Sequence, residues 1–244
     1  QQRIIYYSAI QGDKFSADVL AHVLDIQVTK LFWELNRLEK LGFLQRMDTK
    51  NDGIEDEYWF KLKTQVLRES IIDELLPRQL QEVELKIADF LSEKVEKYKE
   101  AVSRLDEYED EEQTGERIDL INRQKNKIKA SLSRNIRETS AHYENSNNFI
   151  NAALYAIKNL KMDINNLEDM KYDFPSPNEK GALREKIDQQ SQRIESLIDR
   201  SYNNMLKISK NCKEKLLDIR INLNVNLARF NKIIGDYNTA KKQI

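Results

Sequence analysis

Residues 28–47 read VTKLFWELNRLEKLGFLQRM, and the hydrophobic period of this segment changes halfway along it. Gly42 separates the two halves and is a typical stop signal, because glycine adopts left-handed backbone angles at little cost. The segment therefore predicts a helix over 28–41 followed by a strand over 43–47. The first half repeats apolar residues at steps of three and four, as a helix does when one face meets a core: Val28, Leu31, Phe32, Leu35 and Leu38.

A second strand is predicted over 57–62, where the sequence reads EYWFKL. The polar residues 49–53 between the two strands favour a turn, so the strands form a hairpin.

Two shorter helices precede this part of the chain, over 4–10 and 16–24. Ser16 stands where its hydroxyl can cap the second helix, and Phe15 occupies the apolar position just before the cap. Three helices followed by a hairpin is the order of a winged-helix domain, which we expect over residues 1–63.

Nearly all of residues 64–244 is predicted to be helical, and we expect a TPR-like α-helical region there because two of its segments, 142–155 and 227–240, resemble TPR hairpin turns. A loop is expected near 163–181, which contains Pro175 and Pro177. The acidic stretch 106–112 is interpreted as a solvated helix end and loop. The expected helices cover residues 66–76, 80–105, 118–143, 149–160, 182–210 and 213–234.

One stretch, residues 219–227, also fits a strand, because apolar and polar residues alternate along it. We interpret it as helix, since no partner strand lies nearby and a lone strand leaves its backbone groups unpaired.

The composition supports a mainly α fold with enough apolar residues for a core: 40% are hydrophobic, and only 6 are Gly and 3 Pro. The charges almost cancel, with 40 Lys and Arg against 41 Asp and Glu, so the whole chain has no field that would gather nucleic acid or membrane. No apolar run approaches the ~20 residues that span a bilayer. The single cysteine, Cys212, indicates a reducing compartment, and we expect a cytoplasmic protein. Because the chain starts at Gln1, we expect a piece of a longer protein.

Two segments resemble the region that follows the nucleotide-binding domain in STAND-type signal-transduction ATPases, which include LuxR-type activators and ATPase modules of adenylate cyclases. They are YSAIQGDKFSADVL at 7–20 and FKLKTQVLRESIIDELLPR at 60–78, continued by VELKIA at 83–88. Thr64 and Glu84 stand where that family commonly has histidines.

Residues 142–155 and 227–240 are similar to TPR hairpin turns, in which glycine permits the turn and alanine a close helix crossing. The resemblance implies a winged helix and helical repeats, with a nucleotide-binding domain N-terminal to them.

Catalytic and cofactor chemistry is not expected. The sequence contains no phosphate-binding loop, so the chain should not hydrolyse ATP. His22 and His142 have no ligand-spaced partner and are interpreted as surface or boundary histidines. The acidic residues 107–112 lack the spacing of a calcium loop, and Cys212 is interpreted as a small packing residue.

The leading hypothesis is therefore a regulatory module that binds another protein or its own ATPase domain. The candidate contact face is the side of the third helix opposite its core stripe, with a tryptophan among three cations: Lys30, Trp33, Arg37 and Lys40. The alternative for Trp33 is packing against later helices of the same chain.

A DNA-binding regulator is the second hypothesis, since winged helices place their third helix in the major groove. Residues 1–62 contain ten acids against eight Lys and Arg, and Asp52, Glu55, Asp56 and Glu57 make the hairpin turn acidic, so tight nucleic-acid binding is not expected. A coiled-coil protein is disfavoured because no heptad repeat persists.

Overall fold

The computed structural model describes residues 2–47, 58–111, 115–169, 177–204 and 210–235. The chain forms two compact units, Gln1–Ser146 and Asn147–Ile244. The described residues are mainly helical, with one small three-stranded sheet in the first unit, which confirms the predicted mainly α class. The domain boundary expected after residue 63 lies inside the first unit.

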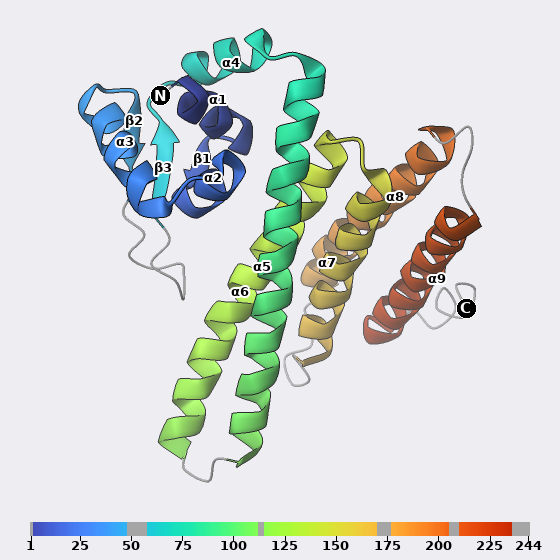
Figure 1. Cartoon of the computed structure of the whole chain (residues 1–244). Helices are drawn as coiled ribbons and strands as arrows, with labels where there is room; N and C mark the ends of the chain where they lie inside the picture. Colours follow the sequence, from blue (N-terminus) through green and yellow to red (C-terminus); the bar gives the residue numbers. More distant parts are fainter. Residues whose placement is uncertain (1, 48–57, 112–114, 170–176, 205–209, 236–244) are drawn as a thin grey trace. The chain divides into compact units, whose positions relative to one another are not determined.

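The first unit begins with short helices and short strands (Figure 1). All strand pairs are antiparallel, in the order β1-β3-β2, and Phe15 lies opposite Phe60. The elements are α1 (Gln2–Gln11), β1 (Lys14–Ser16), α2 (Ala17–Leu24), α3 (Val28–Lys40), β2 (Leu44–Arg46) and β3 (Trp59–Leu62).

The core of this part lies between α3 and one face of the sheet. Phe15 and Phe60 are fully buried, and their rings stack with centroids 5.9 Å apart. The predicted core stripe of α3 packs in the same cluster, where Leu31 and Leu35 are also fully buried. Gly42 has φ +82, so the helix ends as its sequence predicted.

Two details differ from the sequence prediction. Strand β1 was not expected, since three residues are too few to show a period. Ser16 does occupy the N-cap of α2, but its side chain makes no capping hydrogen bond. The pairing with β3 explains this: successive strand residues point to opposite faces, and Phe15 takes the core face, so Ser16 points to the other. The expected turn at 49–53 lies outside the described residues.

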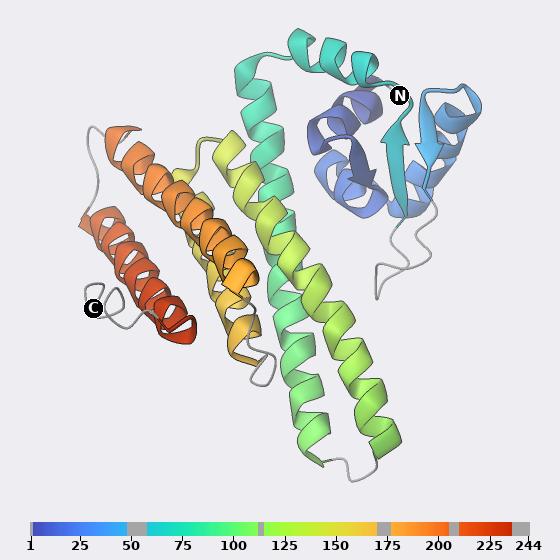
Figure 2. The ribbon, with the colours of Figure 1, turned by 180° about the vertical axis from the view of Figure 1, so that it is seen from behind.

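Three further helices complete the first unit: α4 (Gln65–Glu74), α5 (Pro77–Glu111) and α6 (Gly115–Asn145). Both views show α5 and α6 running side by side as a long hairpin (Figures 1 and 2). A second apolar cluster joins the start of α5 to α1 and α2; its buried members are Ile10, Val19, Val23, Val83, Ile87 and Leu91. Tyr7 and Ile72 pack against both clusters of this unit.

The acidic stretch at 106–112 is not a loop as far as Glu111, because α5 continues to that residue. Two of its carboxylates also have a partner. Lys125 of α6 forms ion pairs with Asp106 and Glu109, the latter at 2.5 Å between Nζ and Oε2. The stretch therefore helps to join the two helices of the hairpin near its tip.

The second unit contains α7 (Phe149–Asp169), α8 (Pro177–Asn204) and α9 (Lys210–Ile233), which pack on one another (Figure 2). The loop expected at 163–181 is wrong at both ends, because α7 runs through Asp169 and α8 starts at Pro177. Ile164 is fully buried, which explains why the helix persists, and proline is tolerated in a first helical turn.

Residues 219–227 are helical, as interpreted from the sequence, and lie within α9. Arg229 of this helix reaches α7, where it pairs with Glu168 and donates to Asn165 at 3.0 Å. Among the helices that the structure describes, none is both long and apolar enough to cross a membrane.

Candidate functional site

The structure brings the four candidate residues onto one exposed face of α3. Lys30, Trp33, Arg37 and Lys40 are all exposed, and Trp33 retains 79% of its accessible surface. Packing of Trp33 against the later helices of the first unit, residues 65–145, is therefore wrong. Leu31 and Leu35 on the opposite face are fully buried, so the helix separates a core stripe from a solvent stripe.

The exposed face also includes Leu41, one residue beyond those that the sequence singled out. Leu41 keeps helical backbone angles, with φ −75 and ψ −7, and so follows Arg37 by one turn. Its side chain is 60% exposed, and that of Phe43 nearby in sequence is 40% exposed. Sequence reasoning missed Leu41 because a leucine beside a glycine stop is usually assigned to the core.

Contacts with β2 and with the residue before β3 hold α3 in place. The backbone N–H of Arg46 in β2 donates to Glu39 Oε1 at 3.0 Å, which joins the end of α3 to the sheet. The ring of Phe32 meets Tyr58 edge-on at 4.4 Å, and the Arg46 guanidinium lies 5.0 Å from the centre of the Tyr58 ring. The helix that carries the exposed face is therefore fixed in place by its contacts with Arg46 and Tyr58.

We define the α3 face as Lys30, Trp33, Arg37, Lys40 and Leu41. It combines one large aromatic group, one aliphatic group and three cations. Arginine and tryptophan are enriched among the residues that dominate protein interfaces.

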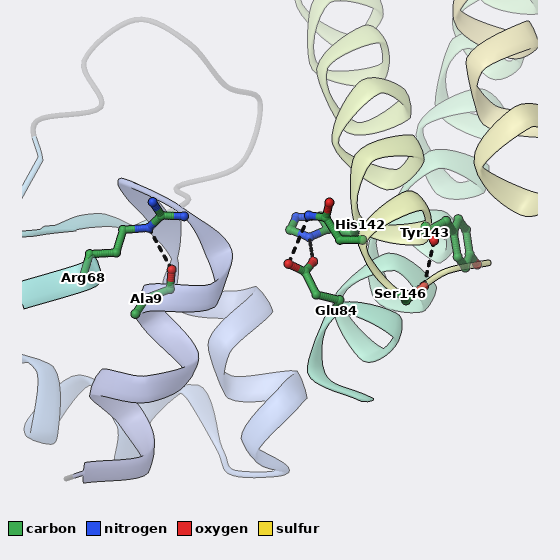
Figure 3. A network of polar contacts seen from close by, with 7 residues as sticks. Ala9, Arg68, Glu84, His142, Tyr143 and Ser146 are labelled. Carbon is green, nitrogen blue, oxygen red and sulfur yellow. Dashed lines mark hydrogen bonds and ion pairs between the residues drawn. The ribbon is translucent and has the colours of Figure 1, made fainter. Parts of the chain in front are cut away.

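Each of the two histidines contacts another side chain of the first unit. His142 pairs through Nδ1 with Glu84, which is only 4% exposed, and Figure 3 shows the two side chains facing each other. Asn145 also donates to Glu84, at 3.1 Å. His22 stacks on Phe90, with ring centroids 4.4 Å apart.

Both positions that depart from the family pattern have structural roles. Thr64 caps α4, its hydroxyl accepting from the Leu67 N–H at 3.3 Å, and Glu84 is the buried partner of His142. The Glu84–His142 pair joins residues 58 apart in the sequence, and no local pattern indicates such a contact.

Other groups considered from the sequence form no reactive site in the described residues. Cys212 is half-buried in α9. In the ranges that the structure describes, no group of three or more His, Cys, Asp or Glu side chains comes together as metal ligands would. The acidic turn residues from Asp52 to Glu57 lie outside those ranges.

Comparison of the chain with protein-family models, with curated proteins and with solved structures gave no match.

Proposed function

We propose that this chain is a non-catalytic, cytoplasmic regulatory module of a larger STAND-type signal-transduction ATPase and that it acts by binding protein. The α3 face docks on the ATPase domain or on another protein, and the helical region contacts a further partner. The observation that carries the proposal is the exposure of Trp33, 79% on a helix whose other face is a packed core.

The arrangement of the first elements supports a winged helix. Three helices are followed by an antiparallel hairpin, and β3 of that hairpin also pairs with β1, which lies between the first two helices. The third helix of this arrangement exposes a face for contact. For the TPR-like assignment, the support is a set of mutually packed helices with fully buried Ala152 and Ala153, small residues that suit a close crossing.

The composition of the α3 face favours a protein partner with acidic groups. Leaving a Trp side chain in water forfeits roughly 2–3 kcal/mol of burial free energy, which docking would recover. Lys30, Arg37 and Lys40 surround that anchor and suit carboxylates at the rim of an interface.

DNA binding is the second candidate, favoured by the three cations on the exposed face of the third helix. The ten acids among residues 1–62, against eight bases, reduce the attraction to phosphates and rank this candidate below protein binding.

The proposal is tested in the longer protein, whose reading frame upstream of Gln1 should encode a phosphate-binding loop. Trp33→Ala and the charge reversals Arg37→Glu and Lys40→Glu should each change the regulated ATPase rate. The matched controls are Arg123→Glu and Lys127→Glu, exposed cations of α6, which should leave that rate unchanged.

Thermal unfolding of the isolated chain separates docking from folding. Because Trp33 is exposed, Trp33→Ala should change stability by less than about 0.5 kcal/mol. If Trp33→Ala lowers the melting temperature by several degrees while ATPase regulation is untouched, Trp33 is structural and the docking proposal fails.

A further inference from the structure

A groove of about 590 Å³ lies in the first unit, lined by residues of α1, α4, α5 and the end of α6. It shares no residue with the α3 face. Pockets that hold small organic ligands measure roughly 300–1,000 Å³, so the groove has room for one or two side chains of a partner.

The floor of the groove is apolar. Ile10 is 4% exposed, and Ile72 and Leu80 are half-buried against the cluster that joins α5 to α1 and α2. Leu76 stands one helical turn before Leu80, whose N–H donates to the Leu76 carbonyl at 3.1 Å, and its side chain is 64% exposed. Apolar surface therefore reaches from the core to solvent at this place, where a partner's side chain could cover it.

One cation and three carboxylates line the groove. The cation, Arg68, already has partners: its Nε donates to the Ala9 carbonyl at 2.9 Å, as Figure 3 shows, and its Nη1 lies 3.7 Å from a carboxylate oxygen of Asp13. The carboxylate of Glu84 is buried and paired with side chains of α6. The charges left to meet a ligand are therefore the other two carboxylates.

Those two carboxylates, Glu69 and Asp73, are exposed and stand one turn apart on α4. Glu69 accepts a hydrogen bond from the Gln65 amide at 2.9 Å, and neither carboxylate forms an ion pair with another residue that the structure describes. Like charges at this spacing destabilise a helix. A cation bound between them would remove that repulsion.

The backbone around the groove also favours a cation. Ile10, Asp73 and Asn145 lie in the last turns of α1, α4 and α6, and the C-terminal end of a helix carries partial negative charge. The last turn of α4 contains no basic residue to offset it. The start of α5 at Pro77 supplies partial charge of the opposite sign, so three negative helix ends stand against one positive end.

We propose that this groove binds a segment of a partner protein in which an arginine stands beside a large apolar residue. The guanidinium lies between Glu69 and Asp73, because its planar fork has donors for two carboxylates. The apolar side chain and the arginine stem cover Ile72 and Leu80. The inference rests on the proposed function, which gives the helical region a further partner, and it states the chemistry of that partner.

The test is methyl NMR of the whole chain during titration with a peptide that has one arginine between two leucines and glycine at both ends. Saturable shifts of the Ile72 and Leu80 methyl signals are expected, with one peptide bound per chain. The signals of Leu217 and Ile221, exposed apolar residues of α9, should not move. A second peptide carries citrulline, the neutral isostere of arginine, and should bind about tenfold more weakly because its hydrogen bonds to the carboxylates are not charge-assisted on both sides.

Three variants locate the charges that matter. Asp73→Asn and Glu69→Gln each remove one carboxylate of the groove and should weaken the arginine peptide about fivefold. The matched control is Glu74→Gln, since Glu74 lies in the same turn of α4, does not line the groove and accepts from the Tyr6 hydroxyl at 3.2 Å. It should leave peptide binding unchanged. Melting temperatures show that the variants are folded, and Asp73→Asn should not lower that of the free chain, because it removes a carboxylate from a helix C-terminus.

The proposal is overturned if the citrulline peptide binds as tightly as the arginine peptide, or if Glu74→Gln weakens binding as much as Asp73→Asn. It is also overturned if spermidine, a free polycation, shifts the Ile72 and Leu80 signals at the same concentrations as the peptide. None of these results bears on the effect of Trp33→Ala on ATPase regulation, so the groove and the α3 face are tested separately.

Discussion

Glu84 is the one carboxylate that the described part of the chain buries almost completely, at 4% exposure. Its two oxygens serve two donors on α6: Oε2 pairs with His142, and Oε1 accepts from Asn145 at 3.1 Å. Buried charges are expensive unless every oxygen is satisfied, and here both are. Glu84 therefore fixes the start of α5 against the end of α6.

Replacing Glu84 with alanine should destabilise the protein by about 3 kcal/mol, because it breaks a pair whose carboxylate is buried and leaves His142, whose side chain is only 13% exposed, without its acceptor. The matched control is Glu82→Ala on the same helix. Glu82 pairs with Arg78 on the surface, and its side chain is 65% exposed, so the cost there should stay below about 0.5 kcal/mol. Urea unfolding midpoints measure both, and equal shifts would contradict the role given to Glu84.

At this scale the sequence allowed only part of the site to be predicted. The spacing of Lys30, Trp33 and Arg37 correctly placed them together on one helix face. Whether Trp33 was exposed depended on what the rest of the chain packs against α3, and local spacing contains no such information. The unpaired hydroxyl of Ser16 was likewise hidden, because its strand pairing joins residues more than forty positions apart.

At the scale of the element, α9 shows how one pattern fits two structures. Its apolar residues alternate with polar ones, yet in a helix alternate residues fall on different sides. Ile219 and Leu223, four apart, are each 1% exposed. Leu217, Ile221 and Val225, also four apart, are 46% to 55% exposed. The helix thus places these apolar residues on two different sides, whereas a strand would place them all on one face.

This division gives a test of the helical assignment. Ile219→Ala should cost about 2–4 kcal/mol as a buried substitution, whereas Ile221→Ala should cost less than about 1 kcal/mol. In a strand both residues would point to the same side and cost alike. Circular dichroism monitored during urea unfolding compares the two variants directly.

The tip of the α5–α6 hairpin depends on pH through Lys125. The Lys125 ammonium, hydrogen-bonded to Glu109, holds the pKa of that carboxyl below its ordinary value. Hydrogen bonds to Asp106 and then to Glu109 raise the pKa of Lys125. The stabilisation from Glu109 is therefore present above its unfolded-state pKa and lost as pH falls through the folded-state pKa. The stabilisation from Lys125 is present below its unfolded-state pKa and lost as pH rises through its folded-state pKa.

Carboxyl NMR titration can follow Glu109 directly. In Lys125→Gln its pKa should rise toward the ordinary value, because the main cause of the lowering is removed. In Lys127→Gln, which changes an exposed lysine of the same helix, it should stay where it is. A Glu109 pKa that is unchanged in Lys125→Gln would show that the ion pair does not form in solution.

Helices were easier to predict than their ends. The long periodic segments that became α3, α5 and α6 were found because packing in a core requires their spacing. The ends of α5 and α7 were placed too early, since charged and polar residues continue a helix when neighbouring helices supply partners, as Lys125 does for Glu109. Strand β1 exists only through its pairing with β3.

At the scale of the whole molecule, the near balance of 40 bases and 41 acids disfavours binding to nucleic acid. The chain should not bind random duplex DNA at submicromolar affinity in physiological salt, because the cations of the α3 face act within a segment of ten acids and eight bases. Fluorescence anisotropy over a salt series measures this. Tight binding with a steep salt slope, reduced by Lys30→Gln, would favour the DNA-binding alternative over protein docking.

The 35-residue helix α5 is about 50 Å long. Its first turns are held in the apolar cluster with α1 and α2, through Val83, Ile87 and Leu91. The rest extends as a stiff pair with α6, bound near its tip by Lys125. Mechanically, this pair is a lever whose pivot is the cluster shared with α1 and α2. The tip at Glu111 lies about 30 Å beyond Leu91, so a tilt of about 5° at the pivot moves it by roughly 3 Å.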